Sequence, residues 1–139
     1  VFGTNYALIY FDLDFFKEVN DKHGHECGDV VLATFAKLIK QLTRVEDVVA
    51  RYGGEEFVAL IHYEENNELE KYLTRVKYMV NKNSFKYKDL RVKITFSAGV
   101  ALRSNYLSYD KTLYYADQFL LQAKSGGRNR IFFDDGLVL

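Results

Sequence analysis

An unbroken apolar run at residues 6–11 sets the strongest limit on the fold, because it ends at two carboxylates, Asp12 and Asp14. A run without polar alternation predicts a strand that is buried on both faces, with helices on either side of its sheet. A carboxylate at the end of such a strand faces the crevice where sheet proteins bind ligands. We expect Asp12 and Asp14 to lie on opposite faces, one toward the crevice and the other capping the next helix.

Helical and strand patterns alternate along the rest of the chain. Apolar residues recur at helical spacing in 29–42, 69–79 and 113–123, and strand-like runs occupy 48–50, 57–61, 92–97 and 131–133. The turn Gly53-Gly54 predicts a β-hairpin, Asp110 is expected to cap the last helix, and Gly126-Gly127 to end it. The order predicts an α+β fold, a ferredoxin-like or palm-type βαββαβ sandwich. Its central sheet is mostly antiparallel, with helices on both faces and the hairpin tip at the active site.

Composition excludes several classes of protein. The 139 residues suit one domain, and 19 basic against 19 acidic residues give no net charge, which argues against a nucleic-acid partner. The only cysteine, Cys27, excludes an internal disulfide and a cysteine-based zinc site. No apolar run approaches the ~20 residues of a membrane helix, so we expect this domain to be cytoplasmic. The chain begins with Val1, and a longer protein around it could be membrane-anchored.

Two acids, Glu55 and Glu56, directly follow the Gly53-Gly54 turn. Glycines at a hairpin tip let the backbone approach a ligand closely. If the hairpin lies beside the first strand, Glu55 comes near Asp12. Two carboxylates and a backbone carbonyl suit Mg²⁺, which binds few protein groups together with substrate phosphate oxygens. Taken alone, the same pattern is more often a tight turn with solvated acids.

Other residues suit a nucleotide. The groups that fit phosphate are the backbone at a helix start and nearby cations: Phe15, Phe16, Lys17, Lys124 and Arg128. Asp29 can accept from the donor edge of guanine, and Asn20 can bond its acceptor edge. Considered separately, Lys124 and Arg128 fit helix capping equally well, and helix capping is the better interpretation of Asn20 and Asp29.

Together, four blocks of sequence resemble the GGDEF family of diguanylate cyclases. Residues 12–29 resemble its opening signature, and 51–57 resemble the naming motif in its GGEEF form. Residues 96–101 are similar to its fourth strand, and 116–130 to its closing block. The resemblance covers most of residues 1–139 as one such domain, without the family's N-terminal lead-in helix.

The resemblance implies a role for each candidate residue. The implied metal ligands are Asp12, the carbonyl of Leu13, and Glu55, with two Mg²⁺ ions in each half-site and Mn²⁺ able to substitute. The implied catalytic residues are Glu55, which takes the proton of the ribose 3′-OH, Glu56 and Lys17. The implied substrate contacts are Phe15, Phe16, Asn20, His25, Asp29, Gly53, Gly54, Lys124 and Arg128.

The implied reaction joins two GTP molecules into cyclic di-GMP and releases two pyrophosphates. One domain holds one GTP, so the resemblance implies a homodimer that meets through its active-site faces, and an upstream sensor or receiver domain that controls it. Arg44 and Asp47 resemble the RxxD motif at which cyclic di-GMP inhibits the enzyme.

Two alternatives remain open from the sequence. The first is a catalytically inactive domain that binds cyclic di-GMP or GTP, although its glycine-acid hairpin is intact. The second, a nucleic-acid polymerase palm, is disfavoured because no basic channel is evident.

Overall fold

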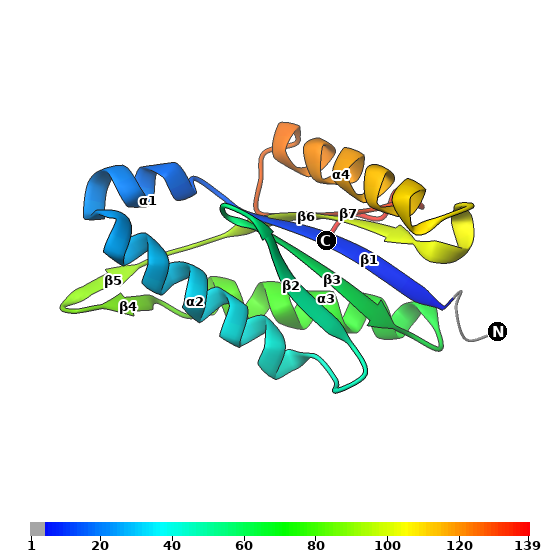
Figure 1. The fold of residues 1–139 in the computed structure, drawn as a ribbon, viewed down its shortest axis with the longest axis horizontal. Helices are drawn as coiled ribbons and strands as arrows, with labels where there is room; N and C mark the ends of the chain where they lie inside the picture. The colour runs from blue at the N-terminus through cyan, green and yellow to red at the C-terminus, as the bar shows by residue number, and fades with distance from the viewer. Residues whose placement is uncertain (1–4) are drawn as a thin grey trace.

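The computed structural model describes residues 5–139, apart from the side chain of residue 66. The helices and strands follow one another along the chain as β1 (Tyr6–Leu13), α1 (Phe16–His23), α2 (His25–Leu42), β2 (Val48–Gly53), β3 (Glu56–His62), α3 (Asn66–Lys82), β4 (Phe85–Tyr87), β5 (Leu90–Val92), β6 (Phe96–Leu102), the short 3₁₀ helix η1 (Arg103–Asn105), α4 (Tyr109–Ser125) and β7 (Ile131–Phe133). Figure 1 shows the arrangement of these elements.

A five-stranded sheet forms the centre of the fold, in the order β2-β3-β1-β6-β7. Its neighbouring strands are antiparallel except for the parallel pair β6–β7. The apolar run identified in the sequence is the middle strand, β1, and seven of its eight residues are buried. The predicted α+β class and mostly antiparallel sheet are thereby confirmed.

Helices cover both faces of this sheet, as predicted. Along β1, Ile9 and Phe11 belong to the larger core beneath α2 and α3, whereas Leu8 and Tyr10 belong to a smaller core beneath α4. This is the alternation expected of strand side chains. In Figure 1, α4 lies on one side of the sheet and α2 and α3 lie on the other.

Three details differ from the sequence-based prediction. The strand predicted at 92–97 is divided, because Val92 belongs to β5 of a separate β4–β5 ribbon and the sheet strand starts at Phe96. Ser108, not Asp110, caps α4, since its hydroxyl accepts from the backbone N–H of Lys111 at 3.1 Å. The additional helix α1 occupies the polar stretch before α2.

The two edges of the sheet end differently. Residues 137–139 fold back along β7, where the N–H of Ile131 donates to the Leu139 carbonyl and the N–H of Leu139 donates to the Ile131 carbonyl. At the other edge, β2 is largely exposed and its pairing with β3 is irregular between Arg51 and Gly53. No helix within the described residues is long and apolar enough to cross a bilayer.

Candidate functional site

The end of β1 and the tip of the β2–β3 hairpin bring the predicted acids together. Asp12 pairs in register with Glu56, and the N–H of Leu13 donates to the Glu55 carbonyl at 3.2 Å. Asp12 is buried, and this burial raises the pKa of its carboxyl group. The charges of Glu55 and Glu56 raise that pKa further, so both acids act on Asp12.

Lys124 partly offsets this negative charge. Its Nζ lies 2.5 Å from Oδ2 of Asp12, and this hydrogen bond and its charge favour the ionised form, lowering the pKa of Asp12. Arg128, in the loop after α4, has its guanidinium 4.9 Å from the centre of the Phe15 ring, a cation–π contact. The structure therefore brings two of the three predicted phosphate-binding cations, Lys124 and Arg128, to the end of the sheet that carries the acids.

Asp14 does not act as predicted. Its carboxylate accepts from the hydroxyls of Thr95 and Ser97, at 2.6 Å each, and from the backbone N–H of Asn129 at 2.9 Å. It lies on the same side of the sheet as Asp12, because residues two apart in an extended chain face the same way. The prediction of opposite faces was therefore wrong, although Asp12 and Asp14 have different partners.

The prediction that an aspartate caps α1 was also wrong. The residue before this helix is Phe15, which has a left-handed backbone (φ 57°) and provides no side-chain cap. The ring of Phe15 is exposed, whereas that of Phe16 is buried in the core. A left-handed non-glycine residue is uncommon and is often retained at a functional turn. Lys17 is exposed at the beginning of the same helix.

Asn20 and Asp29 lie close together where α1 meets α2. A Cβ built on Gly28 would come within 1.9 Å of the Asn20 side-chain oxygen, so the absence of a side chain at Gly28 leaves room for this amide. Asp29 is the next residue along α2. Gly28 was missed as a site residue, because the helical pattern was predicted to begin at residue 29, whereas α2 begins at His25 and includes this glycine. His25, the first residue of α2, is exposed.

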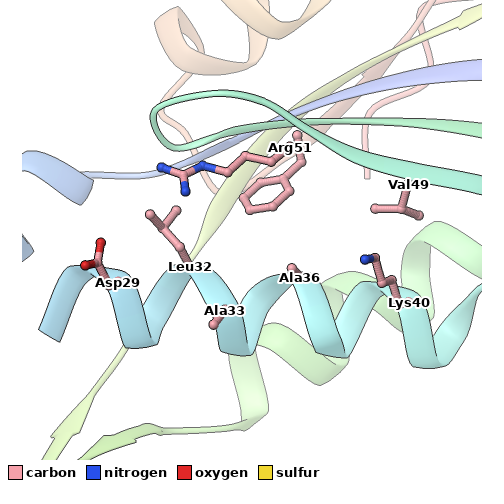
Figure 2. A pocket seen from close by; sticks show the side chains of 8 residues that line it. Asp29, Leu32, Ala33, Ala36, Lys40, Val49 and Arg51 are labelled. Atoms are coloured by element: carbon pink, nitrogen blue, oxygen red, sulfur yellow. The ribbon is translucent and has the colours of Figure 1, made fainter. Parts of the chain in front are cut away.

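A pocket of about 390 Å³ starts at Asp29 and runs between α2 and the β2–β3 hairpin. Its walls are mostly apolar, with two cations, and consist of Asp29, Leu32, Ala33, Ala36, Lys40, Val49, Arg51 and Phe57. Figure 2 shows Arg51 extending from β2 toward the end of α2 that carries Asp29. Such a slot, with an acid at its mouth and apolar walls, suits a planar ring that has hydrogen-bond donors.

Arg51 also holds the hairpin tip. Its Nε donates to the carbonyl of Gly54 at 2.9 Å, next to Glu55. A Cβ placed on Gly54 would have no atom within 4 Å, and a Cβ placed on Gly53 would have only the Glu56 carboxylate, at 3.6 Å. The hairpin tip is therefore open to a ligand, and Arg51 connects it to the pocket beside α2.

Arg44 and Asp47 contact each other in the loop before β2. The Asp47 side chain is only 2% exposed, and it accepts from the N–H groups of His62 (3.0 Å) and Arg44 (3.1 Å). The Arg44 guanidinium is half exposed and forms an ion pair with Glu46 at 3.5 Å. Asp47 thus shapes this loop, whereas Arg44 can reach a ligand.

A second pocket, of about 280 Å³, adjoins this loop. It is lined by Arg44 together with Lys71 and Arg75 of α3, two cations that the sequence reasoning missed. The hydroxyl of Tyr72, in the same lining, is buried and has no hydrogen-bond partner within the part of the chain that is described. The lining also holds Asp47 and Glu68, so its cations exceed its acids by one, and with the unused donor of Tyr72 this suits an anionic ligand.

The residues that could hold a divalent metal are the acids at the end of β1 and at the tip of the β2–β3 hairpin. Nowhere in the described residues do three or more His, Cys, Asp or Glu side chains form a metal-binding group. The predicted set needs only two such side chains, Asp12 and Glu55, with the carbonyl of Leu13. The raised pKa of Asp12, caused by burial and by neighbouring acids, fits a carboxylate that a cation would stabilise. The residues therefore fit a hard divalent ion.

Comparison with known proteins gives consistent matches over this chain. The family model described as "Diguanylate cyclase, GGDEF domain" matches residues 3–130. Diguanylate cyclase A of Treponema denticola is 36% identical over 126 residues, covering 90% of this chain and 34% of that protein. Diguanylate cyclase DgcZ of Escherichia coli is 35% identical over 131 residues, covering 94% of this chain and 44% of that protein. The chain thus spans less than half the length of these curated relatives.

Solved structures show the same fold. The GGDEF domain of DgcB from Caulobacter crescentus, in complex with c-di-GMP, matches with a TM-score of 0.89 and 32% identity, covering 96% of this chain and 80% of that one. Diguanylate cyclase SiaD from Pseudomonas aeruginosa, in complex with its activator SiaC, matches with a TM-score of 0.87 and 35% identity. The match covers 94% of this chain and 50% of the SiaD chain.

Proposed function

This chain belongs to the GGDEF family of diguanylate cyclase domains, and we propose that it condenses two GTP molecules into cyclic di-GMP and two pyrophosphates. The observation that carries the proposal is that the hairpin acids lie beside the end of β1. Asp12 pairs with Glu56, the N–H of Leu13 donates to the Glu55 carbonyl, and Lys124 is held 2.5 Å from Asp12. We take residues 1–139 as one such domain.

In each of the two bond-forming steps, the ribose 3′-oxygen of one GTP attacks the α-phosphorus of the other. The new O–P bond forms as the bond to pyrophosphate breaks, and Glu55 accepts the 3′-OH proton. When bound, Mg²⁺, or Mn²⁺ in its place, neutralises charge on the phosphate oxygens. Asp12, Glu55 and the Leu13 carbonyl would hold it, with Glu56 completing a second metal position.

Guanine recognition is assigned to the junction of α1 and α2. Asp29 offers a carboxylate at one end of the 390 Å³ pocket, and Asn20 offers an amide beside the neighbouring Gly28. His25 is exposed at the start of the same helix. Adenine lacks the donor edge that a carboxylate reads, so Asp29 favours GTP over ATP.

Phosphate binding is assigned to the backbone of Phe15 and Phe16 and to the cations Lys17, Lys124 and Arg128. Lys124 is bonded to Asp12 in this structure, so we expect it to exchange that carboxylate for a phosphate oxygen when substrate and metal bind. The contact of Lys124 with Asp12 supports a role for this lysine in balancing charge during turnover.

Each half-site holds one GTP, so we propose that two copies meet through their hairpin faces in a symmetric dimer. The surrounding protein would supply the controlling sensor or receiver domain. We propose a cytoplasmic site of action, and we expect no nucleic-acid partner.

A product assay tests the cyclase proposal. The protein is incubated with GTP and Mg²⁺, and cyclic di-GMP is quantified by chromatography and mass spectrometry. We expect product with the unmodified chain and with Glu65→Gln, an exposed acid before α3, and none with Glu55→Gln. Absence of product even after fusion to a dimerising helix would contradict the proposal, as would full activity of Glu55→Gln.

A second proposed function is binding of cyclic di-GMP beside Arg44, either as feedback inhibition or as the sole role of an inactive domain. Arg44, Lys71 and Arg75 line one pocket, which supports an anionic ligand there. Calorimetric titration with cyclic di-GMP should show binding that Arg44→Ala weakens at least tenfold. Equal affinity of the variant would refute this site, and binding without cyclase activity would favour the inactive domain.

A further inference from the structure

A pocket of about 260 Å³ lies on the α4 side of the sheet, apart from the nucleotide pocket between α2 and the hairpin. Three tyrosines, two aspartates and a leucine form its lining: Tyr10, Tyr52, Asp110, Leu113, Tyr114 and Asp117. They come from β1, β2 and α4, so three separate elements converge on it. None of these lining residues is basic.

The tyrosine rings make this pocket a surface for a cation. The rings of Tyr10 and Tyr52 meet edge to face, with centroids 5.6 Å apart. Tyr52 is 58% exposed and Tyr114 is 56% exposed, so both present ring surface to an incoming group. The faces of such rings carry negative electrostatic potential and attract cations within about 6 Å.

The charged side chains of the lining have the same sign as the ring faces. Asp110 and Asp117 project from α4 into the lining, and Glu56 lies next to it, where it accepts a hydrogen bond from the Tyr10 hydroxyl at 3.1 Å. Because that hydroxyl donates to Glu56, it is not available to an anion.

We propose that this pocket receives the guanidinium group of an arginine side chain carried by a segment of a partner protein. A guanidinium is planar, so it can stack on tyrosine while its N–H groups bond carboxylates in a fork. An ammonium group has no face with which to stack.

The neighbouring surface favours a polypeptide over a free small cation. The aromatic surface continues from Tyr114 to Tyr115, whose rings meet edge to face at 5.1 Å, and Tyr115 stacks on Tyr106 at 4.8 Å. Leu107, just before α4, is almost fully exposed. An exposed apolar surface beside a charged pocket is typical of a protein contact, because the segment that carries the cation also covers the surface.

A nuclear magnetic resonance titration of the ¹⁵N-labelled chain tests the pocket. The probes are N-acetylarginine amide and N-acetylcitrulline amide, which have nearly the same shape but differ in charge. We expect saturable shifts with arginine at the amides of Tyr10, Tyr52 and residues 110–117, and none with citrulline. Equal shifts from both probes, shifts elsewhere on the chain, or no saturation would each overturn the proposal.

Variants and a longer probe make the test specific. The double change Asp110→Asn with Asp117→Asn should weaken arginine binding at least fivefold, and so should Tyr114→Ala, while Asp89→Asn, in the turn between β4 and β5, should not. Unchanged affinity in a folded double variant would overturn the assignment. The capped peptide Leu-Arg-Leu should bind more tightly than arginine amide or guanidinium chloride. Equal affinities would overturn the inference that the partner is a polypeptide.

Discussion

At the scale of single residues, Asp14 is a structural acid. Its carboxylate accepts three hydrogen bonds in a buried setting, from Thr95, Ser97 and Asn129. Asp14→Ala leaves those donors without an acceptor, so we expect the free energy of unfolding to fall by about 3 kcal/mol. Denaturant titration followed by circular dichroism measures this. Asp21→Ala, an exposed change on α1, serves as the control, and equal effects of both changes would refute this role.

The thiol of Cys27 provides a second prediction at this scale. Cys27 is fully buried in the larger core, and burial raises the pKa of its thiol. Thiolate is the reactive form, so we expect a thiol reagent such as Ellman's reagent to label the native chain only on unfolding, at least 100-fold more slowly than a chain in denaturant. Rapid labelling of the native protein at pH 8 would show that α2 opens readily.

Single residues also show where sequence reasoning succeeds and fails. The guanine-reading pair was predicted by residue chemistry, and the structure places Asn20 beside Gly28, next to Asp29, although their role stays a prediction. The partners of Asp14 were not predictable, because Thr95 and Asn129 are distant in sequence and the turn into α1 is made by a left-handed Phe15.

At the scale of elements, the contact of β6 with α4 depends on Gly99. A Cβ at this position would lie 2.0 Å from the Ala116 carbonyl oxygen and 2.4 Å from the Leu120 nitrogen, both backbone atoms. The helix must therefore move away from the sheet in Gly99→Ala, and we expect a loss of about 3 kcal/mol in the free energy of unfolding. Gly54→Ala, where no atom lies within 4 Å, is the control in the same thermal and denaturant melts. A stable Gly99→Ala would show that α4 packs less closely.

Long periodic elements were predicted well, and element ends were not. The spacing of apolar residues located α2, α3 and α4, because each buries one stripe against the sheet. The split between β5 and β6 could not be predicted from alternation, since an extended segment continues the pattern whether or not it pairs. The cap at Ser108 was missed because Asp110 suits a helix start equally well by composition.

At the scale of the whole molecule, the proposed reaction needs two copies of the site. If two half-sites must meet, specific activity should rise with protein concentration and approach a plateau once the chain is fused to a dimerising coiled coil. Rates of cyclic di-GMP formation over a hundredfold range of concentration measure this. Specific activity that is constant over that range for the unfused chain would exclude assembly as the limiting step.

The distribution of charge over the whole molecule was beyond sequence analysis. The net charge of zero argues against a strongly basic nucleic-acid binder, but it does not show how the charges are arranged on the surface. The cations Arg44, Lys71 and Arg75 outnumber the acids Asp47 and Glu68 around one pocket, whereas the charged residues that line another are the acids Asp110 and Asp117. Composition sums charge over the chain, and only the fold determines which charges are neighbours.

The unequal edges of the sheet limit how copies of this chain can stack through their backbones. At the β7 edge, residues 137–139 already pair with β7, while the largely exposed β2 carries an irregularity between Arg51 and Gly53. Edge-to-edge growth into a fibre requires two long, regular edges, so that each added chain offers a new template. Within residues 5–139, β7 is already paired on its outer side and β2 is irregular, so neither described edge offers a long, regular template for such growth.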